Sequence, residues 1–144
     1  MKDDDAQDAR IRAILGDSDD MTWEEAVQRF CRHLTASLQL PCDVTGAEDF
    51  RWEEYYVFGP GDPEEYEELR KTRPSYQDTY ELLSIDDGVR SKWMLFYGDL
   101  VASVRRRSDG KEFYLGLAEL DVVDKHSPNR QLVDDYGVWF VSNR

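Results

Sequence analysis

The sequence is poor in the residues that form most catalytic and transition-metal centres. Its 144 residues include only two histidines and two cysteines. Cys31 and Cys42 lack the spacing of a zinc site or a redox pair, and His33 and His126 stand in unlike contexts. The chain has no nucleophile elbow, no phosphate-cradling glycine loop and no helical zinc-protease motif. We therefore predict that this protein is not an enzyme.

Long apolar runs are also lacking. No stretch approaches the roughly 20 apolar residues that span a bilayer. The start of the chain, Met1–Asp5, lacks the apolar segment of a secretory signal. These two absences predict a cytoplasmic protein with no membrane partner.

Positive charge is scarce. Asp and Glu total 31 against 18 Lys and Arg, which gives a formal net charge of -13. Charge of this sign repels nucleic-acid phosphates and attracts cations and basic protein surfaces. Hydrophobic residues still make up 40% of the chain, enough for one folded domain of this length. We expect no nucleic-acid partner, and we expect either a cation or a basic protein.

The chain is predicted to divide into a flexible acidic arm over residues 1–20 and a single domain over residues 21–144. The arm holds acidic clusters around an apolar stretch that is too short for a stable isolated helix. Its cluster at residues 17–20 does not open an EF-hand loop. Counted from Asp17, the sixth and twelfth positions hold Thr22 and Gln28, where that loop needs Gly and Glu.

The order of elements predicts an α+β fold, with an amphipathic N-terminal helix packed on a small antiparallel, barrel-like sheet. That helix is predicted from about residue 22 to 39, because Thr22 and Glu25 form a capping box before a stripe of regularly spaced apolar residues. A second helix should begin after Asp62 and end before Pro74. Strands are predicted at residues 79–85, 92–97, 100–106, 111–115 and 138–141.

Two acidic clusters fall on predicted loops. Asp49, Glu53 and Glu54 lie within six residues, and Asp86 and Asp87 precede a glycine between two predicted strands. Calcium takes six to eight oxygens from carboxylates, backbone carbonyls and water, and loops leave their carbonyls free. These five acids are the predicted calcium ligands. A solvated acidic surface accounts for each cluster equally well.

The basic and aromatic residues are assigned structural roles. The basic run Arg105–Arg107 is predicted to pair with nearby carboxylates. The tryptophans are spread through all segments, which favours packing over a base-stacking platform among basic residues. They are Trp23, Trp52, Trp93 and Trp139.

Four stretches of the chain share a pattern with a known family: residues 34–44, 113–120, 124–129 and 134–140. They resemble a bacterial family of small acidic calcium-binding proteins that are not EF-hands, the CcbP-like type seen in cyanobacteria. The resemblance covers roughly residues 22–144 and implies a compact α+β domain that holds calcium with surface acids. It implies Asp86 and Asp87 as ligands, in the acidic connection between two strands.

Two functions are compatible with these features. The first is a calcium-binding protein that acts as a buffer or a sensor. The second is an acidic protein-interaction module, or a DNA mimic, that binds a basic partner. Calcium dependence distinguishes the first, and sensitivity to salt without sensitivity to a chelator distinguishes the second.

Overall fold

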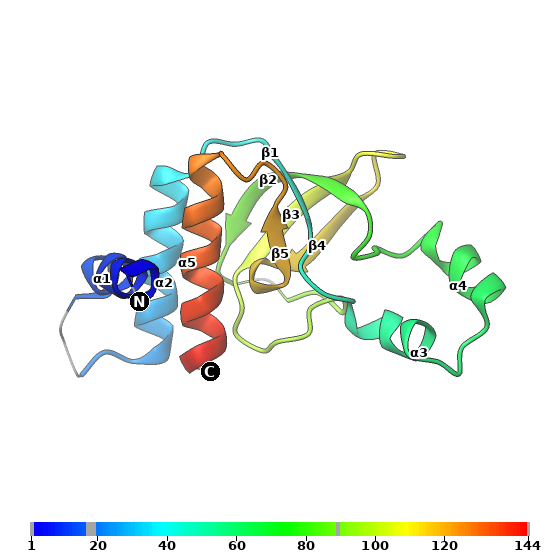
Figure 1. The fold of residues 1–144 in the computed structure, drawn as a ribbon, viewed down its shortest axis with the longest axis horizontal. Helices are drawn as coiled ribbons and strands as arrows, with labels where there is room; N and C mark the ends of the chain where they lie inside the picture. The colour runs from blue at the N-terminus through cyan, green and yellow to red at the C-terminus, as the bar shows by residue number, and fades with distance from the viewer. Residues whose placement is uncertain (1, 17–19, 89, 144) are drawn as a thin grey trace.

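The computed structural model describes residues 2–16, 20–88 and 90–143, and it forms an α+β domain around one five-stranded antiparallel sheet (Figure 1). Residues 17–19, which belong to the predicted acidic arm, lie outside the described residues. The elements in chain order are α1 (Lys2–Leu15), α2 (Trp23–Ser37), β1 (Cys42–Gly46), η1 (Arg51–Glu53), α3 (Glu54–Val57), α4 (Pro63–Arg70), β2 (Thr79–Asp86), β3 (Val101–Arg106), β4 (Glu112–Gly116), η2 (Leu117–Glu119), β5 (Leu120–Val122) and α5 (Pro128–Asn143).

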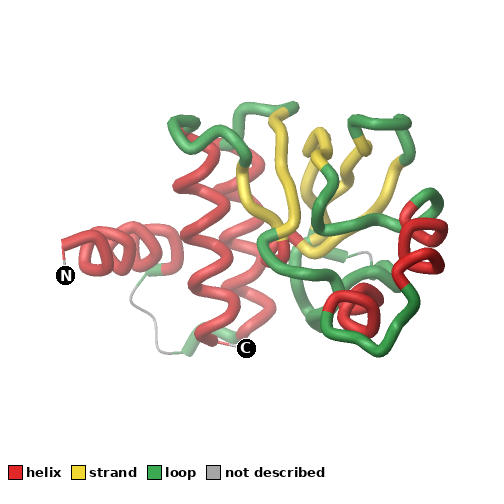
Figure 2. The backbone as a smooth tube through the Cα atoms, turned by 45° about the vertical axis from the view of Figure 1, so that its right-hand side comes forward, coloured by secondary structure: helices red, strands yellow, loops and turns green. Residues whose placement is uncertain are grey.

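The predicted α+β class is confirmed, and the sheet is open. Its strand order is β4-β3-β2-β1-β5, so β4 and β5 form two separate edges, and the term barrel-like describes it only loosely. Helices α2 and α5 lie side by side along the sheet, and α1 crosses their outer surface (Figure 1). Helices α3 and α4 project at the opposite end, in the long excursion between β1 and β2 (Figure 2). None of the described helices is both long and apolar enough to cross a membrane.

The core lies between the sheet and the α2–α5 pair. The predicted cap of α2 is confirmed, because the Glu25 amide donates to the Thr22 hydroxyl at 3.2 Å. Phe30 of α2 is fully buried against α5. Trp23 stacks on Trp139 with ring centroids 4.8 Å apart, as expected for tryptophans that serve packing.

Two predicted strands are wrong. Residues 138–141 belong to α5, where Trp139 and Phe140 are buried while Val138 and Val141 are exposed. A short apolar run on a largely buried helix cannot be distinguished from a strand by its spacing. Residues 92–97 form an irregular segment over the core, with no partner strand. The other predicted strands from residue 79 to residue 115 are confirmed as β2, β3 and β4.

Helix α1 packs on the rest of the domain through a buried carboxylate. Asp135 of α5 is 3% exposed, and it accepts hydrogen bonds from Arg10 Nε at 2.8 Å and from Gln7 Nε2 at 3.0 Å. Ile11 and Ile14 pack against the hydrophobic core. The contacts tie the described part of the arm to α5, and its flexibility stays a prediction.

The basic run pairs with carboxylates, as predicted. Arg106 is 2% exposed and contacts Asp78 at 3.1 Å and Asp109 at 2.8 Å. Its guanidinium also donates to backbone carbonyls in the turn that follows α4. Arg105 pairs with Glu81 at 3.4 Å. The run therefore anchors the α3–α4 excursion to β3.

Candidate cation site

The second predicted acidic cluster lies where β2 ends beside α2. Asp86 is the last residue of β2 and stands opposite Val101 of β3. Asp87 begins the connection to β3 and lines a cavity of about 190 Å³, with Val27 of α2 on another wall. Asp99, which enters the same cavity from the far end of this connection, was not predicted from the sequence. Two acidic residues twelve positions apart in the chain thus line one space, together with Arg90.

Asp99 is held in place by hydrogen bonds from residues that do not line the cavity. It is 6% exposed, and its Oδ1 accepts a hydrogen bond from the Tyr136 hydroxyl of α5 at 2.6 Å. The Ala118 amide of η2 donates to its Oδ2 at 3.1 Å. Tyr136 in turn accepts from the Leu100 amide at 2.9 Å. Two other elements and the start of β3 therefore fix this carboxylate at the cavity.

A second buried acid, Glu119, stands next to Asp99. Glu119 is 9% exposed, and its Oε2 accepts from the Leu95 amide at 3.0 Å. A Cβ atom on Gly116 would lie 2.5 Å from Asp99 Oδ2 and 2.6 Å from Glu119 Oε2. Both carboxylate oxygens therefore converge on the one position of β4 that has no side chain.

Burial makes these two acids hard to ionise. Desolvation raises the pKa of Asp99 to about 7, against the hydrogen bonds from Tyr136 and Ala118, and the charge of Glu119 raises it further. Desolvation likewise raises the pKa of Glu119 to about 7. Near neutral pH the pair therefore retains protons that ordinary carboxylates have already lost. A cation in the cavity would compensate the negative charge that these acids carry once they ionise.

We expect the calcium-free protein to lose stability as pH rises from about 5 to about 8. Both pKa values lie above the ordinary 3.8 and 4.5 of the unfolded chain, so the native state binds more protons in this range. This contribution is fully present below the unfolded values of 3.8 and 4.5, falls as pH rises above them, and is lost once pH has risen through about 7. Melting temperatures in chelator at constant ionic strength would measure the slope.

Glu119→Gln is the matched variant for this measurement, because its amide cannot ionise. Its melting temperature should change less between pH 5 and pH 8 than that of the unchanged protein. A flat profile in the unchanged protein would contradict the raised pKa values of the buried pair.

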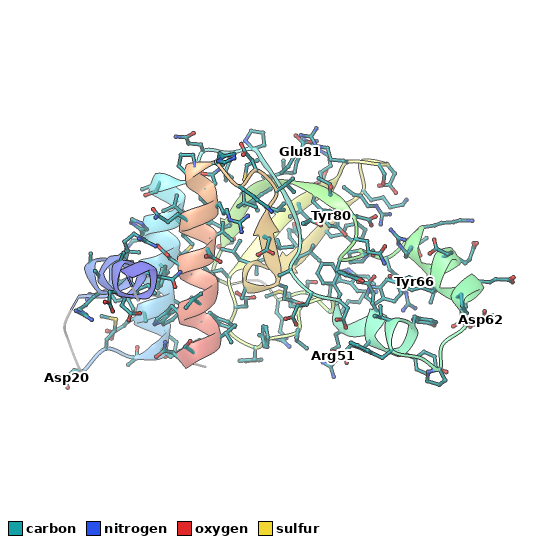
Figure 3. The ribbon with its side chains drawn as sticks, in the orientation of Figure 1. Asp20, Arg51, Asp62, Tyr66, Tyr80 and Glu81 are labelled. Atoms are coloured by element: carbon teal, nitrogen blue, oxygen red, sulfur yellow. The ribbon has the colours of Figure 1, made fainter. Side chains whose placement is uncertain are left out.

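Glu53, from the first predicted cluster, is completely buried and has four donors. Its Oε1 accepts from the amides of Phe50 at 3.2 Å and Tyr76 at 2.8 Å. Its Oε2 accepts from the Tyr66 hydroxyl at 2.6 Å and the Ser75 hydroxyl at 2.7 Å. Tyr66 points back from α4 towards the sheet (Figure 3). These bonds hold η1, α4 and the segment that precedes β2 together, and they account for the buried carboxylate without an ion.

The five predicted acids do not form one site. Glu53 ends η1, directly before α3, and α3 lies far from α2 (Figure 1). Asp87, in contrast, shares its cavity with Val27 of α2. Asp49 is partly exposed and Glu54 is exposed, on either side of the buried Glu53. Across the described ranges, no three side chains of His, Cys, Asp or Glu are grouped so that they could hold a metal ion. The structure instead places Asp87 in the lining of one cavity with Asp99, an acid that pattern alone did not identify.

A local signal for the buried pair exists in the sequence. Glu119 is the only charged residue in the otherwise apolar run from Leu115 to Leu120. Asp99 directly precedes Leu100 and the apolar start of β3 at Val101. An acid inside an apolar run is rarely left buried without partners, so both positions were candidates for a polar network.

Comparison with known proteins supports the fold. No protein-family model matches the chain, and no curated protein matches its sequence. A solved structure described as a calcium binding protein in the calcium-binding form superposes with a TM-score of 0.59 at 14% identity, over 96% of this chain and 91% of that one. The crystal structure of Anabaena CcbP superposes with a TM-score of 0.59 at 15% identity, over 94% and 89%. The chain therefore has the fold that its resemblance to CcbP-like proteins implied.

Proposed function

We propose that this protein binds calcium in the cavity beside α2, through Asp87 and Asp99, with the adjacent Asp86 as a further ligand. The observation that carries the proposal is that two acidic residues from opposite ends of the β2–β3 connection line one cavity. The fold is shared with a protein described as being in a calcium-binding form, which supports this choice of ion.

The donor set suits a hard cation. Calcium takes six to eight oxygens, and two carboxylates supply only some of them. Residues 87–88 and 90–100 of the connection lie outside the strands, so their backbone carbonyls are not committed to a sheet ladder. Those carbonyls and water would complete the shell. His and Cys, which transition metals prefer, are not among the residues that line the cavity.

The proposed site is not an EF-hand. An EF-hand takes its ligands from one twelve-residue loop between two helices, whereas these acids come from the ends of two paired strands. We propose that the protein acts in the cytoplasm as a calcium buffer or sensor. Asp49 and Glu54 are proposed as ligands of a separate, exposed site, where few fixed donors surround them.

Isothermal titration with calcium and with magnesium tests the proposal. Calcium should bind, and at a free concentration a hundredfold above the dissociation constant it should stabilise the fold by about 2.7 kcal/mol. For a domain of this size that gain corresponds to a rise of several degrees in melting temperature. Absence of both binding heat and a melting shift in 1 mM calcium would overturn the proposal.

A second candidate function is docking of a basic protein. Two aromatic residues at the α3 end are unusually exposed, Tyr55 at 56% and Phe58 at 77%. They lie next to Glu54 and near the acidic first turn of α4. Exposed aromatics within a field of acids fit a basic partner. Binding that salt abolishes and that chelator leaves unchanged would favour this function over calcium binding.

A further inference from the structure

A hollow between three segments gathers positive charge and indole rings. It has a volume of about 470 Å³, and it is lined by Arg51 and Trp52 of η1, Arg73 from the segment after α4, and Lys92 and Trp93 from the β2–β3 connection. Figure 3 places Arg51 beside α3, away from α1 and α2. In a chain with a net charge of -13, the described lining holds three cations and no carboxylate.

The three cations are not neutralised by the protein. Within the described part of the chain, Arg51, Arg73 and Lys92 have no carboxylate oxygen within 4.0 Å of their charged nitrogens. The basic run on β3 behaves differently, because each of its arginines pairs with an acid. Cations left unpaired in so acidic a protein are available to an incoming anion.

The indole rings position these cations. The Arg73 guanidinium carbon lies 5.3 Å from the centroid of the Trp52 ring, and Lys92 Nζ lies 4.7 Å from that of Trp93. Trp52 is itself fixed, because its Nε1 donates to the Pro74 carbonyl at 2.6 Å. Cation–π contact orients the cations without neutralising them, since the ring carries no net charge.

We propose that this hollow binds a small anion that carries a flat ring, with the chemistry of a nucleoside phosphate. The cations would hold the phosphate oxygens, and the ring would stack on the Arg73 plane and on exposed indole surface. The volume falls within the range of about 300–1,000 Å³ that small-molecule sites occupy. A longer polyanion is disfavoured, because the charge of the whole molecule repels it.

Titration of intrinsic fluorescence and heat with AMP and ATP tests this assignment. Trp52 and Trp93 lie in the hollow, so binding should change their emission. Adenosine and inorganic pyrophosphate separate the two parts of the ligand. We expect ATP to bind more tightly than either part, and the affinity to fall as salt rises. The titrations are run in calcium and in chelator, so the outcome does not depend on the proposed calcium site.

Three results would overturn the assignment. One is no binding of AMP or ATP at millimolar concentration. Another is pyrophosphate binding as tightly as ATP, which would remove the role of the ring. The third is a ten-nucleotide single strand binding more than about tenfold tighter than ATP, which would point to a nucleic-acid groove instead.

Single variants locate the site. Arg73→Gln and Lys92→Gln should each weaken ATP binding about tenfold, the effect of losing one charge-assisted contact. Lys125→Gln is the matched control, because it removes the same charge from an exposed position outside the hollow. Its affinity should equal that of the parent. Melting temperatures of all three should stay near that of the parent, since neither Arg73 nor Lys92 forms an ion pair among the described residues. Equal affinity in all three variants would overturn the site.

Discussion

Replacing both Asp87 and Asp99 by asparagine is expected to weaken calcium binding by at least about a hundredfold, which is the loss of two charge-assisted ligands. The variant should still fold. Asparagine has the shape of a protonated aspartate, and the pKa of Asp99 near 7 means that the native structure already accommodates the neutral form. The amide oxygen can still accept from Tyr136 and Ala118. Isothermal titration measures the loss.

Net charge alone needs its own control, because the double substitution removes two negative charges. Glu112→Gln combined with Asp121→Asn removes the same charge from the two edge strands, where both side chains are exposed. Calcium affinity should remain close to that of the parent. Equal weakening in both double variants would mean that the general field of the protein, and not the cavity, attracts the ion. Parent-like affinity in the Asp87–Asp99 variant would place the ion elsewhere.

Glu53→Ala is expected to lower the free energy of unfolding by about 3–5 kcal/mol, a large share of the stability of a domain. The substitution leaves four donors around a buried void, two backbone amides and the hydroxyls of Tyr66 and Ser75. Urea denaturation in chelator measures the change. The neighbouring Glu54→Ala should change the free energy by no more than about 0.5 kcal/mol, because its side chain is exposed.

A second substitution at Glu53 distinguishes a structural role of this residue from a role as a calcium ligand. Glu53→Gln keeps the size of the side chain and one acceptor oxygen, so part of the population should remain folded at low temperature. Its calcium affinity per folded molecule should match that of the parent. A folded Glu53→Gln protein that has lost calcium binding would instead identify Glu53 as a ligand, as the sequence pattern predicted.

Local rules were sufficient for several elements. The capping box and the apolar stripe predicted α2, and alternation with an Asp-Gly turn predicted the β3–β4 hairpin. They failed where the deciding partner is distant in sequence. The aromatic run at residues 92–97 has strand composition but no neighbouring strand. Strand β1 was not predicted, because only Val44 among its five residues is fully buried, while its place between β2 and β5 comes from pairing.

The two tryptophans of the hollow show the same limit. Trp52 and Trp93 are 41 positions apart, so their even spread along the chain predicted packing and no shared surface. Folding of the β1–β2 excursion against the β2–β3 connection brings both rings to one hollow with unpaired cations. The distance between the two residues in the sequence carries no information about this contact. The entropic cost of closing so long a loop changes only slowly with its length, so many pairs of residues could be brought together at similar cost.

The sequence by itself determined the charge of the protein, its fold class and the absence of familiar catalytic motifs, because each depends on composition or on neighbours within a few residues. It also determined that oxygen donors far outnumber nitrogen and sulfur ones. Tertiary structure alone decided which of the 31 acids line the cavity beside α2 and which are buried acceptors that hold segments together through hydrogen bonds. Pairing of Val101 with Gly116 in the β3–β4 ladder brings Asp99 to Glu119. Burial then raises the pKa of both, and neither effect exists until the strands have found their register.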